Sequence, residues 1–286
     1  MIQGIVFDLD DTLYKQQAPF ASAINDLFPT FPESKMNALF IRFRYYSDLH
    51  YMKSITGEWS LAKMRYERIR LALADFDFVP SKSELETFQA AYDHALKTIT
   101  LPSEISDSLT FLNQQDVPLG LITNGPVLRQ KEKISALQLA RWIAPEKMII
   151  SDAVGIQKPE PKIFSLMETR LKLAPESLLY IGDSFENDVI GAKAAGWSVW
   201  WFNHQNRKIP EGQSAIFEKE IKNFEDLKSL LTNQKVCRTE RGILFFFYFY
   251  SPKLKIMRIS SSVSLLVCSS LPWMTFWNSS RFSCCS

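Results

Sequence analysis

The chain opens on Gly4-Ile5-Val6-Phe7, a run of β-prone apolar residues, followed at once by Asp8-Leu9-Asp10-Asp11-Thr12. A continuous apolar run is typical of a strand covered on both faces, and open α/β sheets bind ligands at the carboxyl ends of such strands. Side chains two apart on an extended segment point the same way, so we expect Asp8 and Asp10 to face one site while Leu9 points into the core. Carboxylates in this position suit a hard cation and a phosphate, although a strand end with a capped turn is a simpler alternative.

Three further apolar runs, at 118–122, 147–150 and 178–181, end in polar residues suited to phosphate or metal. They lead into Thr123-Asn124-Gly125, into a loop that carries Lys158, and into Gly182-Asp183 with Asn187 and Asp188 soon after. Helical patterns lie between these runs, which indicates a parallel sheet with right-handed crossovers. We therefore predict an α/β fold: a Rossmann-like parallel sheet with helices on both faces and an inserted helical segment. All four polar endings would gather at one edge of the sheet.

In this order, the four segments resemble the signature motifs of the haloacid dehalogenase (HAD) superfamily, in the group with a helical cap inserted after the first motif. The resemblance covers about residues 1–232. It implies that Asp8 is a nucleophile that forms an aspartyl-phosphate, and that Asp10 protonates the leaving oxygen and then activates water. It also implies a Mg²⁺ site made by the Asp8 carboxylate, the Asp10 backbone carbonyl and Asp183.

The same resemblance assigns substrate contacts. Thr123 would hydrogen-bond a phosphate oxygen, with Asn124 close by, and Gly125 and Thr12 are also assigned to substrate binding. These residue types fit the task, because charge on the equatorial oxygens of a phosphoryl group in transfer must be stabilised in place.

Lys158 would bring positive charge to the phosphate and to Asp8, lowering the pKa of that carboxylate. A surface lysine in a proline-rich loop is the alternative. Asp188, with Asn187 beside it, would orient Lys158 or a metal-bound water. It fits equally well as an acid placed in the first turn of a helix by the helix dipole.

Asp10 also separates the reaction classes within the superfamily. The dehalogenases of the superfamily lack an acid at this position, so its presence favours phosphate transfer. We expect hydrolysis of a small phosphomonoester, with a nucleoside monophosphate as one candidate because the opening motif resembles that of nucleotidases and the inserted segment is aromatic. The alternatives are a sugar-phosphate mutase of the same superfamily, and a HAD-like binding module whose site has decayed.

The inserted segment, 18–99, shows helical periodicity and is predicted to form a small cap, with residues 1–17 and 100–233 as the core. Solvated helix faces are the favoured interpretation of its basic residues, although some of them could reach an anionic substrate. These residues are Arg42, Arg44, Lys63, Arg65, Arg68 and Arg70.

Residues 234–286 differ in composition from the rest of the chain. Residues 237–286 hold six Lys and Arg against one acidic residue, together with all four cysteines. The aromatic run 243–250 is too short to span a bilayer, and an interfacial or an extra folded segment are alternatives. We expect an atypical, poorly ordered tail that is prone to aggregate.

Residues 1–236 carry no cysteine and start directly in a predicted strand, so we expect a cytoplasmic protein without a signal peptide. Their 27 basic and 30 acidic residues argue against nucleic acid as a partner. We expect no membrane contact for the core and a monomer or a homodimer.

Overall fold

A computed structural model describes residues 2–232 and, beyond them, 236–238, 244–246, 255–260 and 263–267. The strands of the main sheet are β1 (Gly4–Phe7), β2 (Leu119–Thr123), β3 (Met148–Ile150), β4 (Leu178–Gly182), β5 (Ser198–Phe202) and β6 (Lys219–Ile221). The helices are α1 (Gln17–Leu27), α2 (Met36–Ile55), α3 (Leu61–Ala74), α4 (Lys82–Lys97), α5 (Ser103–Gln114), α6 (Val127–Ala136), α7 (Ser151–Val154), α8 (Pro161–Leu171), α9 (Gly191–Ala194) and α10 (Phe224–Thr232).

The six strands form one sheet in the order β3-β2-β1-β4-β5-β6, and every neighbouring pair is parallel. The first strand in sequence therefore lies between β2 and β4 in the middle of the sheet. The polar residues that follow these three strands meet at one edge, because parallel strands end on the same side. The predicted fold class is confirmed.

Both faces of the sheet are covered by helices. Ile5 and Phe7 of β1 pack on the face that α5 and α10 cover, whereas Val6 packs on the opposite face with α8. This alternation follows from the two-residue period of a strand, and it explains why the run 4–7 is apolar throughout.

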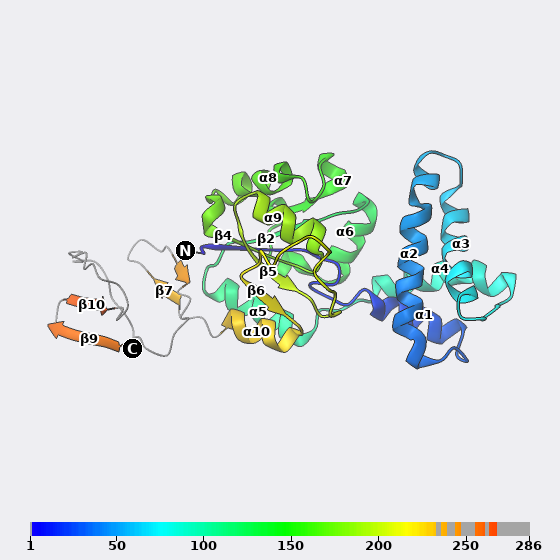
Figure 1. The fold of residues 1–286 in the computed structure, drawn as a ribbon, viewed down its shortest axis with the longest axis horizontal. Helices are drawn as coiled ribbons and strands as arrows, with labels where there is room; N and C mark the ends of the chain where they lie inside the picture. The colour runs from blue at the N-terminus through cyan, green and yellow to red at the C-terminus, as the bar shows by residue number, and fades with distance from the viewer. Residues whose placement is uncertain (1, 233–235, 239–243, 247–254, 261–262, 268–286) are drawn as a thin grey trace.

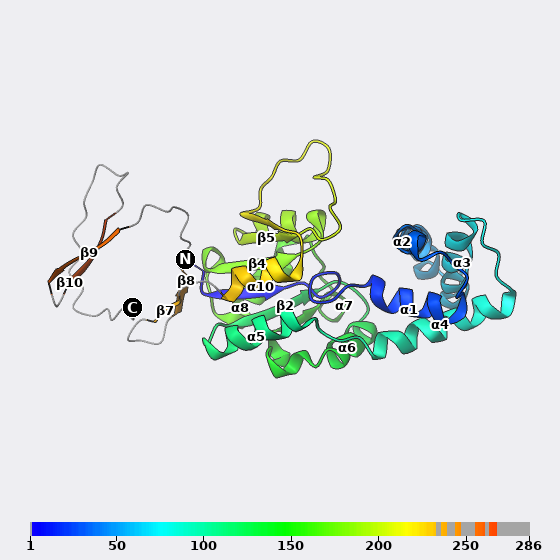
Figure 2. The same cartoon turned by 90° about the horizontal axis from the view of Figure 1, so that it is seen from below.

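Helices α1 to α4 lie together beyond the carboxyl ends of the strands, on the side opposite the N-terminus (Figures 1 and 2). Ser81 and Glu84 form a capping box that starts α4, and the Ser60 side chain caps α3. The group is held by an aromatic centre in which the ring of Phe20 lies 4.7 Å from that of Phe43 and 5.8 Å from that of Phe88. Most aromatic residues of the inserted segment thus serve as core.

The predicted tail is described only in short pieces. Strands β7 (Val236–Arg238) and β8 (Leu244–Phe246) pair antiparallel, as do β9 (Lys255–Ser260) and β10 (Val263–Val267). The other residues of 234–286, on which the expectation of a poorly ordered tail rests, lie outside the described residues. Within the described part, no helix combines the length and apolar character needed to cross a bilayer.

Candidate active site

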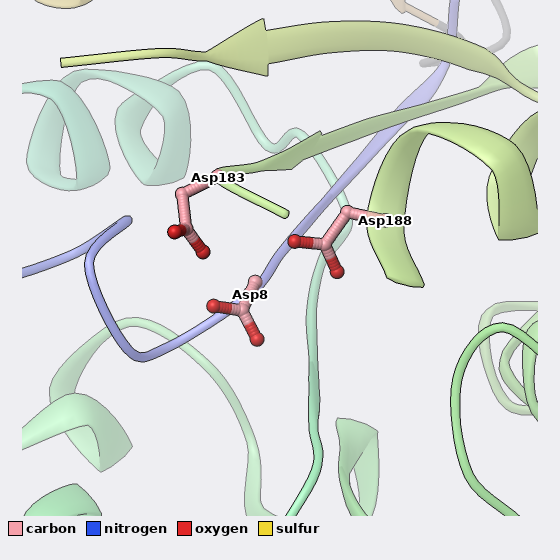
Figure 3. Close-up of side chains that lie close together, drawn as sticks. All are labelled: Asp8, Asp183 and Asp188. Carbon is pink, nitrogen blue, oxygen red and sulfur yellow. The ribbon is translucent and has the colours of Figure 1, made fainter. Parts of the chain in front are cut away.

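Three carboxylates meet at the carboxyl edge of the sheet (Figure 3). Asp8 directly follows β1, Asp183 directly follows β4, and Asp188 lies in the π-helical turn Phe185–Ile190. One oxygen of each lies within 4.8 Å of the others. The side chains of Asp8 and Asp188 are almost fully buried. Oxygen atoms this close are what a hard divalent cation needs, so Asp8 and Asp183 fit a Mg²⁺ ion, with Asp188 beside them.

Lys158 holds two of these carboxylates. Its Nζ donates hydrogen bonds of 2.6 Å to Asp8 Oδ1 and 2.6 Å to Asp188 Oδ1, and one of 3.0 Å to the hydroxyl of Tyr180. Tyr180 in turn donates to the carbonyl of Ile122 at 3.1 Å. The lysine is 3 % exposed, so it is not the surface residue of the alternative interpretation. Asp188 faces it directly, as expected of a residue that orients Lys158.

The charges of this cluster are not balanced. Burial raises the pKa of Asp8 to about 7, Asp188 and Asp10 add to this rise, and Lys158 opposes it. Burial and the neighbouring carboxylates also raise the pKa of Asp183 well above its usual value. Burial lowers the pKa of Lys158, but Asp188 and Asp8 outweigh burial and raise it. The lysine thus stays charged and, as expected, acts to lower the pKa of Asp8. Burial has the larger effect, so the pKa of Asp8 rises overall. The remaining negative charge favours a bound cation.

Asp10 lies apart from the three clustered carboxylates. Its carboxylate accepts hydrogen bonds from Lys133 Nζ at 2.7 and 2.8 Å, from Gln130 Nε2 at 3.0 Å and from the Tyr14 hydroxyl at 2.5 Å. Burial acts to raise its pKa, but Lys133 and the hydrogen bonds lower it to about 2. Leu9 is buried, as predicted. The strand itself ends at Phe7, and Asp11 adopts a left-handed φ of 59°. The alternation of side chains between the two faces of the strand therefore does not continue past Leu9.

Residues at the end of β2 and in the loop after it hold parts of the site in place. Thr123 is buried, and its hydroxyl accepts a hydrogen bond from Gln130. The side chain of Asn124 accepts from the backbone N–H of Lys158 at 2.9 Å and donates to its carbonyl at 2.9 Å. This amide therefore fixes the backbone of Lys158, and contact of Asn124 with the substrate stays a prediction. The backbone N–H of Gly125 donates to Ser151 Oγ at 3.0 Å.

Two residues that were predicted to belong to the site make none of the contacts described above. Thr12 is fully buried, and its hydroxyl has no hydrogen-bond partner among the described residues. Asn187 is half-buried, and its backbone N–H donates to Ser184 Oγ at 3.2 Å.

Sequence reasoning missed four residues that shape the site: Tyr180, Gln130, Lys133 and Arg207. Arg207 Nη1 lies 3.0 Å from Asp183 Oδ2. A tyrosine inside an otherwise apolar strand is a usable signal, since a buried hydroxyl needs a partner. Gln130 and Lys133 belong to a charged helical run that resembles a solvated face, although their spacing of three residues places them side by side on α6.

The haloacid dehalogenase-like hydrolase model matches residues 5–202 of the chain. The chain belongs to this family. A glyceraldehyde 3-phosphate phosphatase of Methanopyrus kandleri is 26% identical over 196 residues, covering 68% of this chain and 82% of that protein. The phosphoglycolate phosphatase of Escherichia coli K12 is 26% identical over 203 residues, covering 68% and 79%. The chain is a phosphatase of this family.

Solved structures of the family share the fold. The HAD hydrolase YfnB of Bacillus subtilis, bound to magnesium, superposes with a TM-score of 0.58 at 22% identity and covers 80% of this chain and 98% of its own. A dehalogenase superposes with a TM-score of 0.62 at 18% identity, covering 81% and 97%. At these identities, the likeness concerns the fold.

Replacing Gly182 by alanine should disturb the site from within the sheet. An added Cβ would lie 2.5 Å from Asp188 Cγ, and Asp188 cannot withdraw because Lys158 and the Ser184 N–H hold it. We expect a loss of about 1–3 kcal/mol in the free energy of unfolding and a loss of phosphatase activity. Urea denaturation and turnover measure both.

The matched control is Gly120→Ala in β2, where the added Cβ meets the flexible thioether of Met167. This variant should lose less stability and keep its activity. Equal activity losses in the two variants would contradict the assigned importance of Asp188.

The Lys133→Met variant tests the ion pair with Asp10. Because the pKa of Asp10 is about 2 in the fold and 3.8 ordinarily, its stabilising contribution is present above pH 4 and is lost as the pH falls toward 2. We expect the variant to be less stable by about 2 kcal/mol at pH 7. Its stability should change less than that of the wild type between pH 4 and pH 2. Chemical denaturation at a series of pH values measures this, and an unchanged pH dependence would refute the pairing.

Proposed function

We propose that the protein is a Mg²⁺-dependent phosphomonoester hydrolase that works through an aspartyl-phosphate on Asp8. The observation that carries this proposal is the buried Asp8 carboxylate, held by Lys158 and facing Asp183 at the carboxyl edge of the sheet. One oxygen of Asp8 is bonded to the lysine, which fixes the orientation of the carboxylate. A second oxygen remains to attack phosphorus.

The chain's own residues supply the groups for both steps. Asp8 forms a bond to phosphorus as the ester oxygen leaves, and a proton donor at Asp10 converts that oxygen to a hydroxyl. In the second step Asp10 takes a proton from water, whose oxygen attacks phosphorus and releases the Asp8 carboxylate. Lys158 offsets the charge of the phosphoryl oxygens throughout. A Mg²⁺ ion held by Asp8, the Asp10 carbonyl and Asp183 would neutralise further charge on those oxygens.

The substrate we propose is a small phosphorylated metabolite. The two relatives named above are phosphatases of glyceraldehyde 3-phosphate and phosphoglycolate, which are both small. A nucleoside monophosphate stays a prediction. Its support from aromatic residues is reduced, because rings such as Phe20 and Phe43 are buried in the core of the helical group.

We also propose that segment 18–99 acts as a cap over the site. Helices α1 to α4 lie beyond the carboxyl ends of the strands, where a ligand would enter. Closure of such a group excludes water during the first step. The cysteine-free segment 1–236 supports a reducing cytoplasm as the place of action.

The alternatives receive less support. A mutase would differ in returning the phosphoryl group to a sugar, and no contact among the described residues favours that outcome. A decayed binding module is disfavoured because Asp8 lies against both Lys158 and Asp183 at the carboxyl edge of the sheet.

The test is hydrolysis of p-nitrophenyl phosphate by the full chain, with Mg²⁺ and with EDTA. We expect EDTA to abolish turnover and Asp8→Asn to lower kcat by at least about a thousandfold, because the nucleophile is lost. Acid-quenched wild-type enzyme should carry a phosphoryl group on the peptide that contains Asp8, as mass spectrometry would show.

Asp107→Asn is the matched control, since Asp107 is an exposed acid paired with Lys228 on the surface. It should keep full activity. Turnover by Asp8→Asn at the wild-type rate, or turnover that is insensitive to EDTA, would refute the proposal.

A further inference from the structure

Arginines from the helical group and from the core converge on one tyrosine. Tyr92 of α4 lies with its ring centroid 6.0 Å from the guanidinium carbon of Arg68 of α3 and 5.6 Å from that of Arg129 of α6. Burial raises the pKa of Tyr92, and the charges of Arg68, Arg44 and Arg129 oppose this rise, which places Arg44 of α2 in the same group. We call Arg44, Arg68 and Arg129 around Tyr92 the arginine cluster.

Arg68 has no acidic partner among the described residues. Its guanidinium donates to two neutral oxygens, Ser47 Oγ at 3.2 Å and Gln89 Oε1 at 2.7 Å, and its Nε is buried without a hydrogen-bond partner in that part of the chain. Burial and the charges of the neighbouring arginines lower the pKa of Arg68 to about 10, while Tyr92 opposes this shift. A positive charge held without a counter-ion, in a place that desolvates it, is unfavourable until an anion arrives.

Carboxylates near the arginine cluster do not neutralise it. Asp93 pairs with Arg129 at 2.7 Å and also accepts a hydrogen bond from Gln89 at 2.8 Å. Asp48 acts on Arg44 but forms no ion pair with it among the described residues. Two other arginines of α2 and α3 are paired, Arg42 with Asp75 and Arg70 with Glu67. Arg68 differs from them because its hydrogen-bond partners are neutral.

The arginine cluster lies near Asp10, because Arg129 is next in sequence to Gln130, whose Nε2 donates to the Asp10 carboxylate at 3.0 Å. The hydroxyl of Tyr14 donates to Asp10 at 2.5 Å, and Tyr14 lies close enough to Tyr92 for their charges to interact. Burial lowers the pKa of Arg44, but negative charges that include Asp48, Asp10 and Asp11 raise it above its usual value. Asp10 is the residue beside which the leaving oxygen would depart. The part of the substrate attached to that oxygen therefore faces the arginines.

We propose that the arginine cluster binds a second anionic group, a carboxylate or a phosphate, at the far end of the phosphomonoester from the scissile phosphate. This inference rests on the proposed function and specifies its substrate class as small dianionic or more highly charged molecules. Arg68 and Arg44 would pair with the second anion, because guanidinium groups bind carboxylate and phosphate in matching planar geometry. Arg129, already positioned by Asp93, would flank the second anion from the core side.

The test compares two substrates that differ at one carbon: 3-phosphoglycerate, which carries a carboxylate, and glycerol 3-phosphate, which carries a hydroxyl there. We expect the wild-type full chain to favour 3-phosphoglycerate in kcat/KM by about tenfold or more, the size of one charge-assisted hydrogen bond. Arg68→Gln and Arg44→Gln should each lower kcat/KM for 3-phosphoglycerate and leave that for glycerol 3-phosphate within about twofold of wild type.

The controls separate recognition from structure. Arg70→Gln, on the same helix as Arg68 but paired with Glu67, should keep the wild-type preference. The guanidinium carbon of Arg68 lies 4.4 Å from the ring centroid of Phe43, so the residue also has a packing role. Arg68→Lys retains the charge and should therefore recover part of the preference. The Arg44 side chain forms no hydrogen bond or ion pair within the described part of the chain, so its substitution should leave the melting temperature unchanged.

Two outcomes would overturn the inference. One is a wild-type enzyme that hydrolyses p-nitrophenyl phosphate but does not distinguish the two substrates. The other is an equal loss for both substrates in the arginine variants, which would mean that the arginines dock the helical group onto the core. If the full chain hydrolyses no phosphomonoester, the proposed function fails. Calorimetric binding of the two compounds to wild type and Arg68→Gln in EDTA then decides the inference alone.

Discussion

The buried ammonium of Lys158 is the interaction on which the site depends. Asp8, Asp183 and Asp188 would repel one another if they were brought together without positive charge, and burial would increase that cost. Lys158 bonds two of them at once, with 2.6 Å to each. The lysine is itself secured, because the Asn124 amide holds its backbone on both sides. Fixing one cation therefore fixes the nucleophile and the neighbouring acid.

The topology of the sheet makes this possible over long distances in sequence. Lys158 is 150 residues from Asp8, and the two meet because β3, which precedes Lys158, lies parallel to β2, and β2 lies parallel to β1. Each motif is local in sequence and ends a strand. Recognising the strands was therefore enough to predict that Asp8, Thr123 and Asp183 approach the same edge of the sheet. This part of the site could be predicted from the sequence alone.

The remaining contacts depend on directions that strand and helix patterns do not specify. The two-residue alternation does not predict the partners of the Asp10 side chain, because β1 stops at Phe7 and the left-handed φ of Asp11 redirects the chain. Lys133 is 123 residues from Asp10 and belongs to a helix of ordinary charged composition. Such partners depend on how α6 is rotated against the sheet. The same limit applies to the arginines of the inserted segment, which a helical pattern cannot divide into paired and unpaired groups.

Asp8 and Asp10 are two residues apart yet reside in opposite electrostatic environments. The pKa of Asp8 is raised to about 7 by burial among acids, whereas that of Asp10 is lowered to about 2 by Lys133 and its hydrogen bonds. Without substrate, this order is the reverse of the assigned roles, because a general acid needs the higher pKa and a carboxylate nucleophile the lower one. The ionised Asp10 seen here is the form that accepts a proton from water in the second step. The first step needs the protonated form, and a phosphate dianion beside Asp10 favours it in two ways. The negative charge raises the pKa of Asp10 directly, and it also competes for Lys133. The substrate therefore helps to create the acid that its own leaving group requires.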